Sequence, residues 1–382
     1  MTISEFKVAN KLITGEGATE KLYEEALRLH MKNPLIVTDT ILLEIGVVDQ
    51  IKEKLKGFSH GVYSGVKPEP EIVLVEECRS VFIEGNHDSV IAVGGGSAID
   101  IAKSVSVYVK HLGNIEDLFE SNAVLEKGVP VIAIPTTAGT GSEVTNIAIL
   151  SDKEAQLKRG IVSNYLLPDV AIVAPEMTLT MPKGVTAASG IDALVHAIEA
   201  YISTNSSPIT DNLALGAMKL IAVNLPIAYQ EPNNMKAREN MATASLMAGM
   251  AFGNAGVAAV HALAYPLGGR FQIAHGVSNA LLLPYVMDWN KTSCLDRFRN
   301  IAEALGESVS NLSDRESADR AVDAMRRLCE TVDIPKGMRH FNVPEEVIPS
   351  MAEDAFKIDR LLKNNPRVLS VQEIEEIYRS AY

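Results

Sequence analysis

The chain has 382 residues, of which 47% are hydrophobic and 22% are charged, and its formal net charge is −13. This length is more than one compact core usually takes, so it predicts two domains, and the composition is that of an ordinary globular protein. The negative charge disfavours nucleic acid and anionic membrane surfaces as partners, because both need a basic face.

The cysteines and the apolar runs indicate a cytoplasmic protein without membrane partners. The three cysteines are scattered without a CxxC pair, which favours a reducing compartment over a disulfide framework. The first residues show no basic segment followed by an apolar one, so no signal peptide is expected. No apolar run approaches the length of about 20 residues that a membrane span needs.

The first half of the chain alternates short apolar runs with helical patterns, which predicts βαβ units and a parallel sheet. These runs lack polar alternation, as strands do when both faces of a sheet are covered. The predicted strands lie in residues 34–39, at the start of 88–100, in 129–137 and in 169–175.

The second half reads as helical, because apolar residues recur there at helical spacing from Asp192 onward. We place the boundary near residue 180, at Pro182-Lys183-Gly184, and expect an α/β domain over 1–180 and an all-helical domain over 181–382. The clearest helical patterns are 212–225, 239–252, 317–332 and 370–382.

A glycine turn follows the predicted strand of residues 88–100. Gly94-Gly95-Gly96-Ser97 leads into a helix that carries Asp100 and Lys103. Glycines let the backbone approach a pyrophosphate closely, and the helix N-terminus supplies free N–H donors. A tight turn without a ligand explains GGGS equally well, and the segment is not a G-x-G-x-x-G fingerprint.

A hydroxyl-rich loop, PTTAGTGSE, occupies residues 135–143 after the next predicted strand. It lies at the carboxyl edge where doubly wound sheets bind ligands, and it could donate hydrogen bonds to a ribose, a phosphate or an amide. A solvated loop is the simpler interpretation of the same composition.

Asp39 ends the strand predicted for residues 34–39. A carboxylate there can accept a hydrogen bond from the 2′-hydroxyl of an adenosine ribose and repel a 2′-phosphate. A helix N-cap is an equally good explanation of an aspartate at this place.

Four residues in the second half form a candidate metal set. Asp192 and His196 are four apart and share a helix face, and His261 and His275 follow in a Gly-rich, apolar stretch. One carboxylate oxygen and three imidazole nitrogens suit Fe(II), Zn(II), Mn(II), Co(II) or Ni(II). A metal held in this way can act as a Lewis acid on a bound oxygen.

These motifs together resemble the signatures of the iron-containing (group III) alcohol dehydrogenases. The resemblance rests on GGGSAIDIAK, PTTAGTGSEVTN, SGIDALVHAIEAY and the segment from His261 to His275 running on into NALLLP, in the order and spacing of the family. It extends over roughly residues 10 to 290, and the combination of four motifs is highly specific. The last residues, about 90 of them, add no motif.

The resemblance implies a dinucleotide-binding α/β domain, a helical metal-binding domain and an active site in the cleft between them. It implies a metal, Fe(II) before the others, at Asp192, His196, His261 and His275. It also implies NAD(H) rather than NADP(H), because of Asp39. The expected cofactor contacts are Asp39, Gly95, Gly96, Ser97, Thr136, Thr137, Thr140 and Lys158. We therefore expect hydride transfer between NAD(H) and a small primary alcohol or aldehyde, in a homodimer or larger homo-oligomer.

Two positions depart from the family pattern. Tyr265 replaces a histidine that is often proposed as a proton relay; a phenol can donate a hydrogen bond but is a poor base at neutral pH. Tyr265 and His275 are the candidate catalytic residues, with Tyr265 as the proton relay; alternatively, the metal makes a strong base unnecessary and the proton leaves through water or the ribose hydroxyls. Glu69-Pro70 replaces Asn-Pro, and this added carboxylate disfavours a cofactor phosphate.

The substrate and the rival functions stay open on the sequence alone. Asn146 and Phe252 match segments that line the substrate pocket of the family, and Arg270 is either a structural arginine or a clamp for an aldehyde that bears a carboxylate, sulfonate or phosphonate. A non-redox synthase similar to dehydroquinate synthases would need a basic cluster, and the motif segments contain none. Glycerol dehydrogenases, maleylacetate reductases and a non-catalytic scaffold fit the motifs less well.

Overall fold

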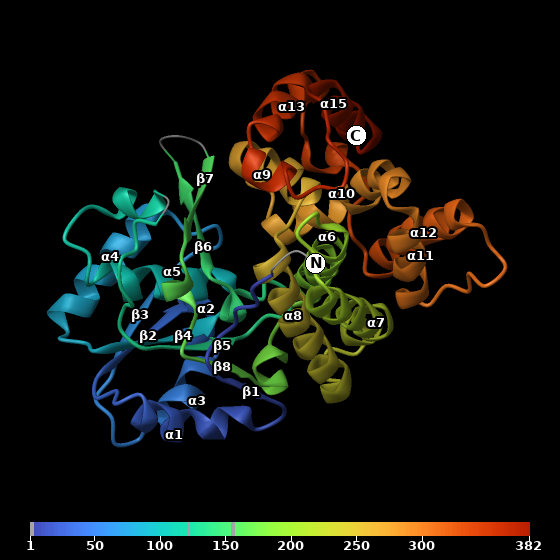
Figure 1. The fold of residues 1–382 in the computed structure, drawn as a ribbon. Helices are drawn as coiled ribbons and strands as arrows, with labels where there is room; N and C mark the ends of the chain where they lie inside the picture. Colours follow the sequence, from blue (N-terminus) through green and yellow to red (C-terminus); the bar gives the residue numbers. More distant parts are fainter. Residues whose placement is uncertain (1–3, 121, 154–156) are drawn as a thin grey trace. The chain divides into compact units, whose positions relative to one another are not determined.

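The computed structural model describes residues 4–120, 122–153 and 157–382, and the chain divides into two compact units (Figure 1). The α/β unit is Lys7–Met181, and the helical unit is Pro182–Tyr382 together with the residues before Lys7. The division falls at the Pro-Lys-Gly segment that marks the change of pattern in the sequence. Each unit is described by itself below.

The α/β unit contains a parallel six-stranded sheet in the order β1-β8-β5-β4-β2-β3. The predicted parallel sheet is therefore confirmed, and the four predicted strands correspond to β2, β4, β5 and β8. The two outer strands, β1 and β3, were not predicted from the sequence. The strands are β1 (Leu12–Thr14), β2 (Pro34–Asp39), β3 (Gly61–Val66), β4 (Ser89–Gly94), β5 (Val131–Pro135) and β8 (Val170–Val173).

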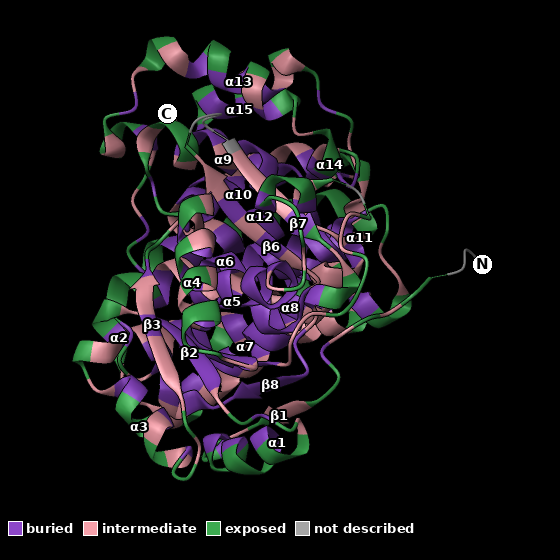
Figure 2. Ribbon diagram, turned by 90° about the vertical axis from the view of Figure 1, so that its left-hand side faces the viewer, coloured by how far each residue is buried: buried purple, intermediate pink, exposed green. Residues whose placement is uncertain are grey.

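Helices cover both faces of this sheet, which explains why its strands are apolar without alternation (Figure 2). Leu35 and Val37 of β2 join a core with α4 and α5, whereas Ile36 joins a second core with α1 and α3. Successive residues of one strand point to opposite faces, so one strand contributes to both cores. The helices are α1 (Leu22–Arg28), α2 (Thr40–Glu44), α3 (Val47–Lys54), α4 (Ile72–Glu84) and α5 (Gly96–Tyr108).

An antiparallel hairpin, β6 (Ile147–Asp152) and β7 (Leu157–Val162), stands apart from the main sheet. It follows the hydroxyl-rich loop directly, and β6 packs against α5. The backbone N–H of Ser151 donates to the carbonyl of Pro70 at 2.8 Å, which attaches the hairpin to the segment after β3. These contacts hold the hairpin, and with it the chain that leaves the loop of residues 135–143, against α5 and Pro70.

The helical unit is built around α6 (Lys183–Ile202), which is buried at nearly every position from Gly190 onward. Helices α7, α8 and α10 pack against it. A polar side chain on such a helix needs a partner, because burying it unpaired costs free energy. The other helices of the unit are α7 (Pro208–Gln230), α8 (Met235–Ala255), α9 (Ala259–Phe271), α10 (His275–Asn290), α11 (Leu295–Ala304), α12 (Asp314–Thr331), α13 (Ile348–Phe356), α14 (Asp359–Leu362) and α15 (Val371–Ser380).

Among the described residues, one helix, α7, is long and apolar enough to cross a membrane by length and composition alone, and the bent pair α8 and α9 passes the same test if it is taken as one span. Helix α7 packs on α6 and α8 within the helical unit. One or two such helices are weak evidence of a membrane span, because core helices of soluble proteins pass the same test.

Candidate active site

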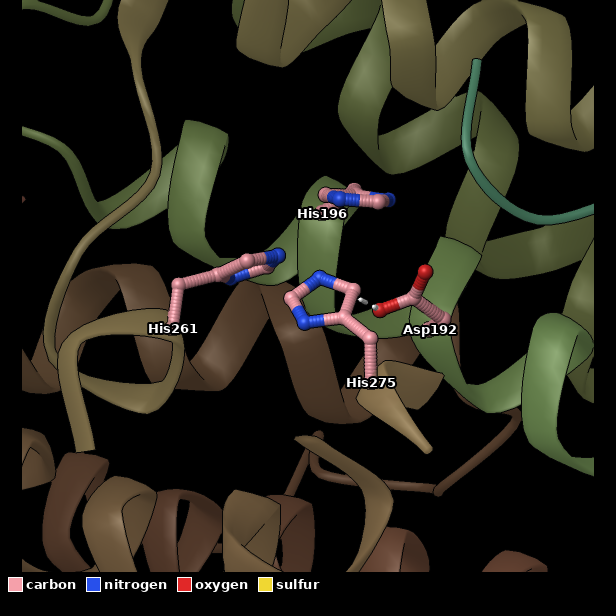
Figure 3. A group of neighbouring side chains, drawn as sticks. All are labelled: Asp192, His196, His261 and His275. Atoms are coloured by element: carbon pink, nitrogen blue, oxygen red, sulfur yellow. Dashed lines mark ion pairs between the residues drawn. The ribbon is translucent and has the colours of Figure 1, made fainter. Parts of the chain in front are cut away.

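Asp192, His196, His261 and His275 come together in the helical unit (Figure 3). Each offers one ligand atom, and these four atoms all lie within 4.8 Å of one another. Asp192 and His196 project from one face of α6, whereas His261 lies in the first turn of α9 and His275 begins α10. The structure thus joins residues that are up to 83 positions apart (275 − 192) into one cluster.

The donor set fits a divalent transition metal. Three residues of the cluster are buried and His275 is half-buried. Burial by itself would raise the pKa of Asp192, but His196, His275 and His261, with a hydrogen bond from Asn279, together hold this pKa below its usual range. The carboxylate is therefore ionised and ready to bind a cation.

Asn279, one turn into α10, lies at the centre of the cluster. Its side-chain nitrogen donates to Asp192 Oδ1 at 2.7 Å and lies 3.2 Å from His261 Nε2 and 3.1 Å from His275 Nε2. Among the described residues, no donor reaches its buried Oδ1. One amide nitrogen here faces three metal-type ligand atoms, which shows that these atoms point to one position.

Glu199 holds His261 from the opposite side. This fully buried carboxylate on α6 accepts from His261 Nδ1 at 2.7 Å, which leaves Nε2 directed at the cluster. Its oxygens also accept from the backbone N–H groups of Ala258 and Val260 at 2.8 and 2.6 Å. Glu199 therefore caps the start of α9 and selects the imidazole tautomer in which Nε2 can bind a metal.

Two aromatic rings border the cluster. Phe252 of α8 stacks on His196, with ring centroids 4.2 Å apart and an interplanar angle of 17°. The ring of Tyr265 on α9 lies with its centroid 6.4 Å from that of His275. Of the residues expected near the substrate and the transferred proton, Phe252 and Tyr265 therefore do lie beside the metal-type ligands.

In the α/β unit, the glycine turn and the hydroxyl-rich loop lie directly against each other. A Cβ atom on Gly96 would lie 2.9 Å from Thr140 Cγ2, and one on Gly95 would lie 3.3 Å from Thr137 Cγ2. The backbone N–H of Thr136 donates to the carbonyl of Gly94 at 3.0 Å. Because Gly95 is the N-cap of α5, the free N–H groups of that helix start beside the threonines.

The remaining residues expected at a cofactor have partners of their own. Asp39 caps α2, since its Oδ1 accepts from the backbone N–H of Leu42 at 2.9 Å. Lys158 of β7 forms an ion pair with Glu69. The helix-cap interpretation of Asp39 is thus realised in the structure, and the departure at Glu69 directly contacts the lysine expected at the ribose.

Arg270 and Asn146 each have partners within their own unit. The Arg270 guanidinium, at the end of α9, donates to Ser350 Oγ at 2.6 Å and pairs with Asp354, both on α13. Asn146 belongs to the α/β unit, where its side chain donates to Asn164 Oδ1 at 3.3 Å. The structural interpretation of Arg270 therefore agrees with its geometry.

Glu199 and Asn279 are not among the residues predicted from the sequence. Both follow a proposed ligand at helical spacing: Glu199 is three residues after His196, and Asn279 is four after His275. Residues three or four apart on a helix share a face, so this spacing was the available signal. Their contacts across α6, α9 and α10, however, depend on the tertiary packing.

Comparisons with known proteins cover both units of the chain. A family model described as "Iron-containing alcohol dehydrogenase" matches residues 9–175, and one described as "Fe-containing alcohol dehydrogenase family, C-terminal" matches residues 186–382. The two matches together span nearly the whole chain and divide it close to the boundary between the units.

Individual relatives are similar over their full length. Long-chain-alcohol dehydrogenase 1 of Geobacillus thermodenitrificans is 46% identical over 96% of this chain and 94% of its own. The NAD-dependent methanol dehydrogenase of Bacillus methanolicus is 38% identical over 99% of this chain and 100% of its own. The solved structure of an alcohol dehydrogenase from Oenococcus oeni superposes with a TM-score of 0.97 at 38% identity, covering all of both chains.

Proposed function

Because the chain belongs to the iron-containing alcohol dehydrogenase family, we propose that Asp192, His196, His261 and His275 bind one divalent metal ion. The protein is an oxidoreductase that acts on the CH–OH group of alcohols and on the corresponding aldehydes. The observation that carries the metal site is the convergence of four ligand atoms within 4.8 Å. Fe(II) is the ion we propose first, with Zn(II), Mn(II), Co(II) and Ni(II) as alternatives that the same donors accept.

The residues of the cluster have distinct tasks in this proposal. The bound ion supplies a Lewis acid to the oxygen of the alcohol or aldehyde. Glu199 keeps Nε2 of His261 free to bind the ion, and Phe252 holds the ring of His196 by stacking. His275 is the most exposed of the four residues and Tyr265 lies beside it, so Tyr265 would be placed to relay the proton of a substrate on this side.

We propose NAD(H) as the cofactor, bound by the glycine turn and the hydroxyl-rich loop. The contact between these two segments supports a shared binding surface, and the N-terminus of α5 favours a pyrophosphate. The carboxylate of Asp39 disfavours the 2′-phosphate of NADP(H), and the added carboxylate of Glu69, paired with Lys158, does so more weakly. The other proposed contacts are Gly95, Gly96, Ser97, Thr136, Thr137, Thr140 and Lys158.

The substrate we propose is a small primary alcohol or its aldehyde, in line with relatives named for methanol and long-chain alcohols. The pairing of Arg270 with Asp354 leaves the anionic-aldehyde alternative without a structural argument. Asn146 stays a proposed substrate contact. We further propose that this soluble enzyme is cytoplasmic and forms a homodimer or larger homo-oligomer.

His275→Ala tests the metal site. We expect bound metal and NADH-dependent reduction of propanal to be lost together, because one of four ligands disappears while the buried frame remains. His340→Ala, an exposed histidine of the same unit, is the matched control and should keep both. Turnover that survives in a metal-free His275→Ala protein would refute the assignment.

Asp39→Gly tests the cofactor. We expect the ratio of kcat/KM for NADH over NADPH to fall by about tenfold or more, because a charge of the same sign as the phosphate is removed. A wild-type enzyme that already prefers NADPH would contradict the proposal.

A further inference from the structure

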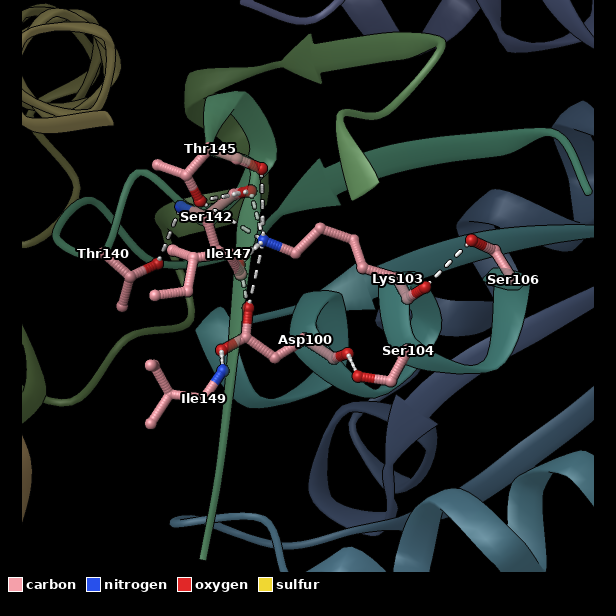
Figure 4. A network of polar contacts seen from close by, with 9 residues as sticks. All are labelled: Asp100, Lys103, Ser104, Ser106, Thr140, Ser142, Thr145, Ile147 and Ile149. Carbon is pink, nitrogen blue, oxygen red and sulfur yellow. Dashed lines mark hydrogen bonds and ion pairs between the residues drawn. The ribbon is translucent and has the colours of Figure 1, made fainter. Parts of the chain in front are cut away.

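Lys103 is a fully buried cation on α5 whose ammonium group faces a single short segment (Figure 4). Its Nζ donates toward Ser142 O at 3.0 Å and Ser142 Oγ at 2.7 Å, and toward Thr145 Oγ1 at 3.2 Å. It also reaches the carbonyls of Thr145 and Ile147. Five oxygens of residues 142–147, and Asp100 Oδ1 as a sixth, thus surround an ammonium that has three N–H donors, so the protein itself takes up its hydrogen-bonding capacity.

Asp100, one turn earlier on the same helix, accepts hydrogen bonds from the same segment. Its Oδ1 accepts from Ser142 Oγ, and its Oδ2 accepts from the backbone N–H of Ile149 at 2.9 Å. The same carboxylate lies 3.2 Å from Lys103 Nζ, which pairs the buried charge. Together the two side chains fasten residues 142–149, from the end of the hydroxyl-rich loop into β6, to α5.

The hydroxyl-rich loop is consequently fixed at both ends. At its start, Thr136 donates to Gly94 of the neighbouring strand, and at its end Ser142 is held by Lys103 and Asp100. Between these two points, Thr140 lies against Gly96 with no room for a side chain on the glycine. The helix that begins at the glycine turn therefore also holds the loop that packs on this turn.

We propose that Lys103 and Asp100 are positioning residues for the cofactor, which act through Ser142 and not by touching the cofactor. They keep the threonine-bearing loop in the arrangement that NAD(H) binds, so binding needs no ordering of the loop. A lysine that follows a glycine turn suggests a phosphate ligand, but the geometry assigns this ammonium to the protein backbone. The inference rests on the proposed NAD(H) site. It adds that Lys103 and Asp100 hold this site in its binding arrangement before NAD(H) arrives.

Lys103→Met in the full-length, metal-loaded enzyme is the principal test. If the Lys103→Met loop is in the binding arrangement about one tenth of the time, the Kd for NADH, measured by NADH fluorescence, rises about tenfold over wild type. The KM for NADH should rise in parallel, whereas kcat at saturating NADH should stay within about threefold, because the loop is ordered once NADH is bound. Lys110→Met, at an exposed lysine two residues beyond the end of α5, is the matched control.

The salt dependence of NADH binding separates positioning from direct contact. A lysine that touched a phosphate would contribute to this salt dependence. A weaker salt dependence in Lys103→Met would therefore overturn the proposal, whereas a raised Kd with an unchanged salt dependence supports it. An unchanged Kd in a folded Lys103→Met protein also overturns it. A wild-type enzyme that binds no NADH would instead refute the proposed cofactor itself.

Two milder variants keep the proposal testable if Lys103→Met does not fold. Ser142→Ala removes the hydroxyl that joins Lys103 to Asp100, and Thr145→Val removes a second oxygen at the ammonium with almost no change in shape. Each should raise the Kd for NADH about threefold with metal content unchanged, and the double variant should raise it further. Wild-type NADH affinity in both folded variants would overturn the proposal.

Discussion

Glu199→Gln is expected to weaken metal binding although Glu199 is not itself a ligand. The carboxylate accepts three hydrogen bonds, from His261 Nδ1 and from the backbone N–H groups of Ala258 and Val260. Glutamine keeps one oxygen and replaces the other with an NH2 group, so at least one of these donors then faces a donor. A lost hydrogen bond to a charged group costs about 1.5–3 kcal/mol.

This cost can be converted into metal affinity. At 1.4 kcal/mol for each factor of ten, it corresponds to roughly a 10- to 100-fold rise in the Kd for the metal, which is the range usual for such supporting carboxylates. The effect arises because His261 can now rotate or change tautomer, so that Nε2 no longer points into the cluster. The substitution leaves all four ligands in place, which distinguishes support of a ligand from loss of a ligand.

The assay is a competition between the protein and a chromogenic chelator for Zn(II) or Co(II), with NADH affinity as a second readout. We expect Glu199→Gln to lose metal affinity, keep its NADH affinity and show a changed Co(II) absorption spectrum. Glu303→Gln, an exposed glutamate of the same unit, should match wild type in all three measurements. Unchanged metal affinity in a folded Glu199→Gln protein would refute the reasoning.

Three further expectations follow from single side chains. Tyr265→Phe should shift the basic limb of the pH–rate profile, because Tyr265 lies beside His275; an unchanged limb would assign the proton to water. Burial raises the pKa of Glu143 to about 7, so its contribution to stability is complete below about pH 4.5 and is lost as the pH rises to about 7. Glu143→Gln, measured by thermal melting, should therefore gain roughly 2 to 3 kcal/mol on wild type between pH 4.5 and pH 8, and a constant difference would contradict this. Arg270→Ala should lower kcat/KM for propanal and for an anionic aldehyde by the same factor, since Arg270 is bound to Asp354. A selective loss of kcat/KM for the anionic aldehyde would instead support the hypothesis that Arg270 binds the anionic group.

The parallel sheet could be predicted because its strands carry a strong local signal. Residues 34–39 are almost entirely buried. An apolar run of this length suits a buried strand better than a helix. The strand β1 has only three residues and β3 is glycine-containing and half-buried, so neither carries a pattern of its own. These two strands are formed by pairing with β8 and β2, which a local pattern cannot reveal.

The four metal-type residues could be selected from the sequence because they match a spacing and a family motif, whereas the contacts around them could not. Asp192 and His196 are related by helix geometry alone. The contact of Glu199 with the start of α9 and that of Asn279 with Asp192 join positions 59 and 87 residues apart. Similarly, the sequence assigns no partner to Lys103, and only the path of residues 142–147 shows which oxygens it meets.

The charges of the cluster explain why it suits a divalent ion. Asp192 and Glu199 are both buried carboxylates, and their partners are imidazoles, which are neutral when they bind a metal, one amide and backbone N–H groups. Two buried negative charges are costly unless a cation balances them, and the burial of ionised groups is tolerated at metal sites for this reason. A monovalent ion would leave one negative charge and a trivalent ion one positive charge. A neutral residue in place of either carboxylate should therefore lower the affinity for a divalent ion, because one negative charge is removed. For Glu199→Gln this effect adds to the disturbance of His261.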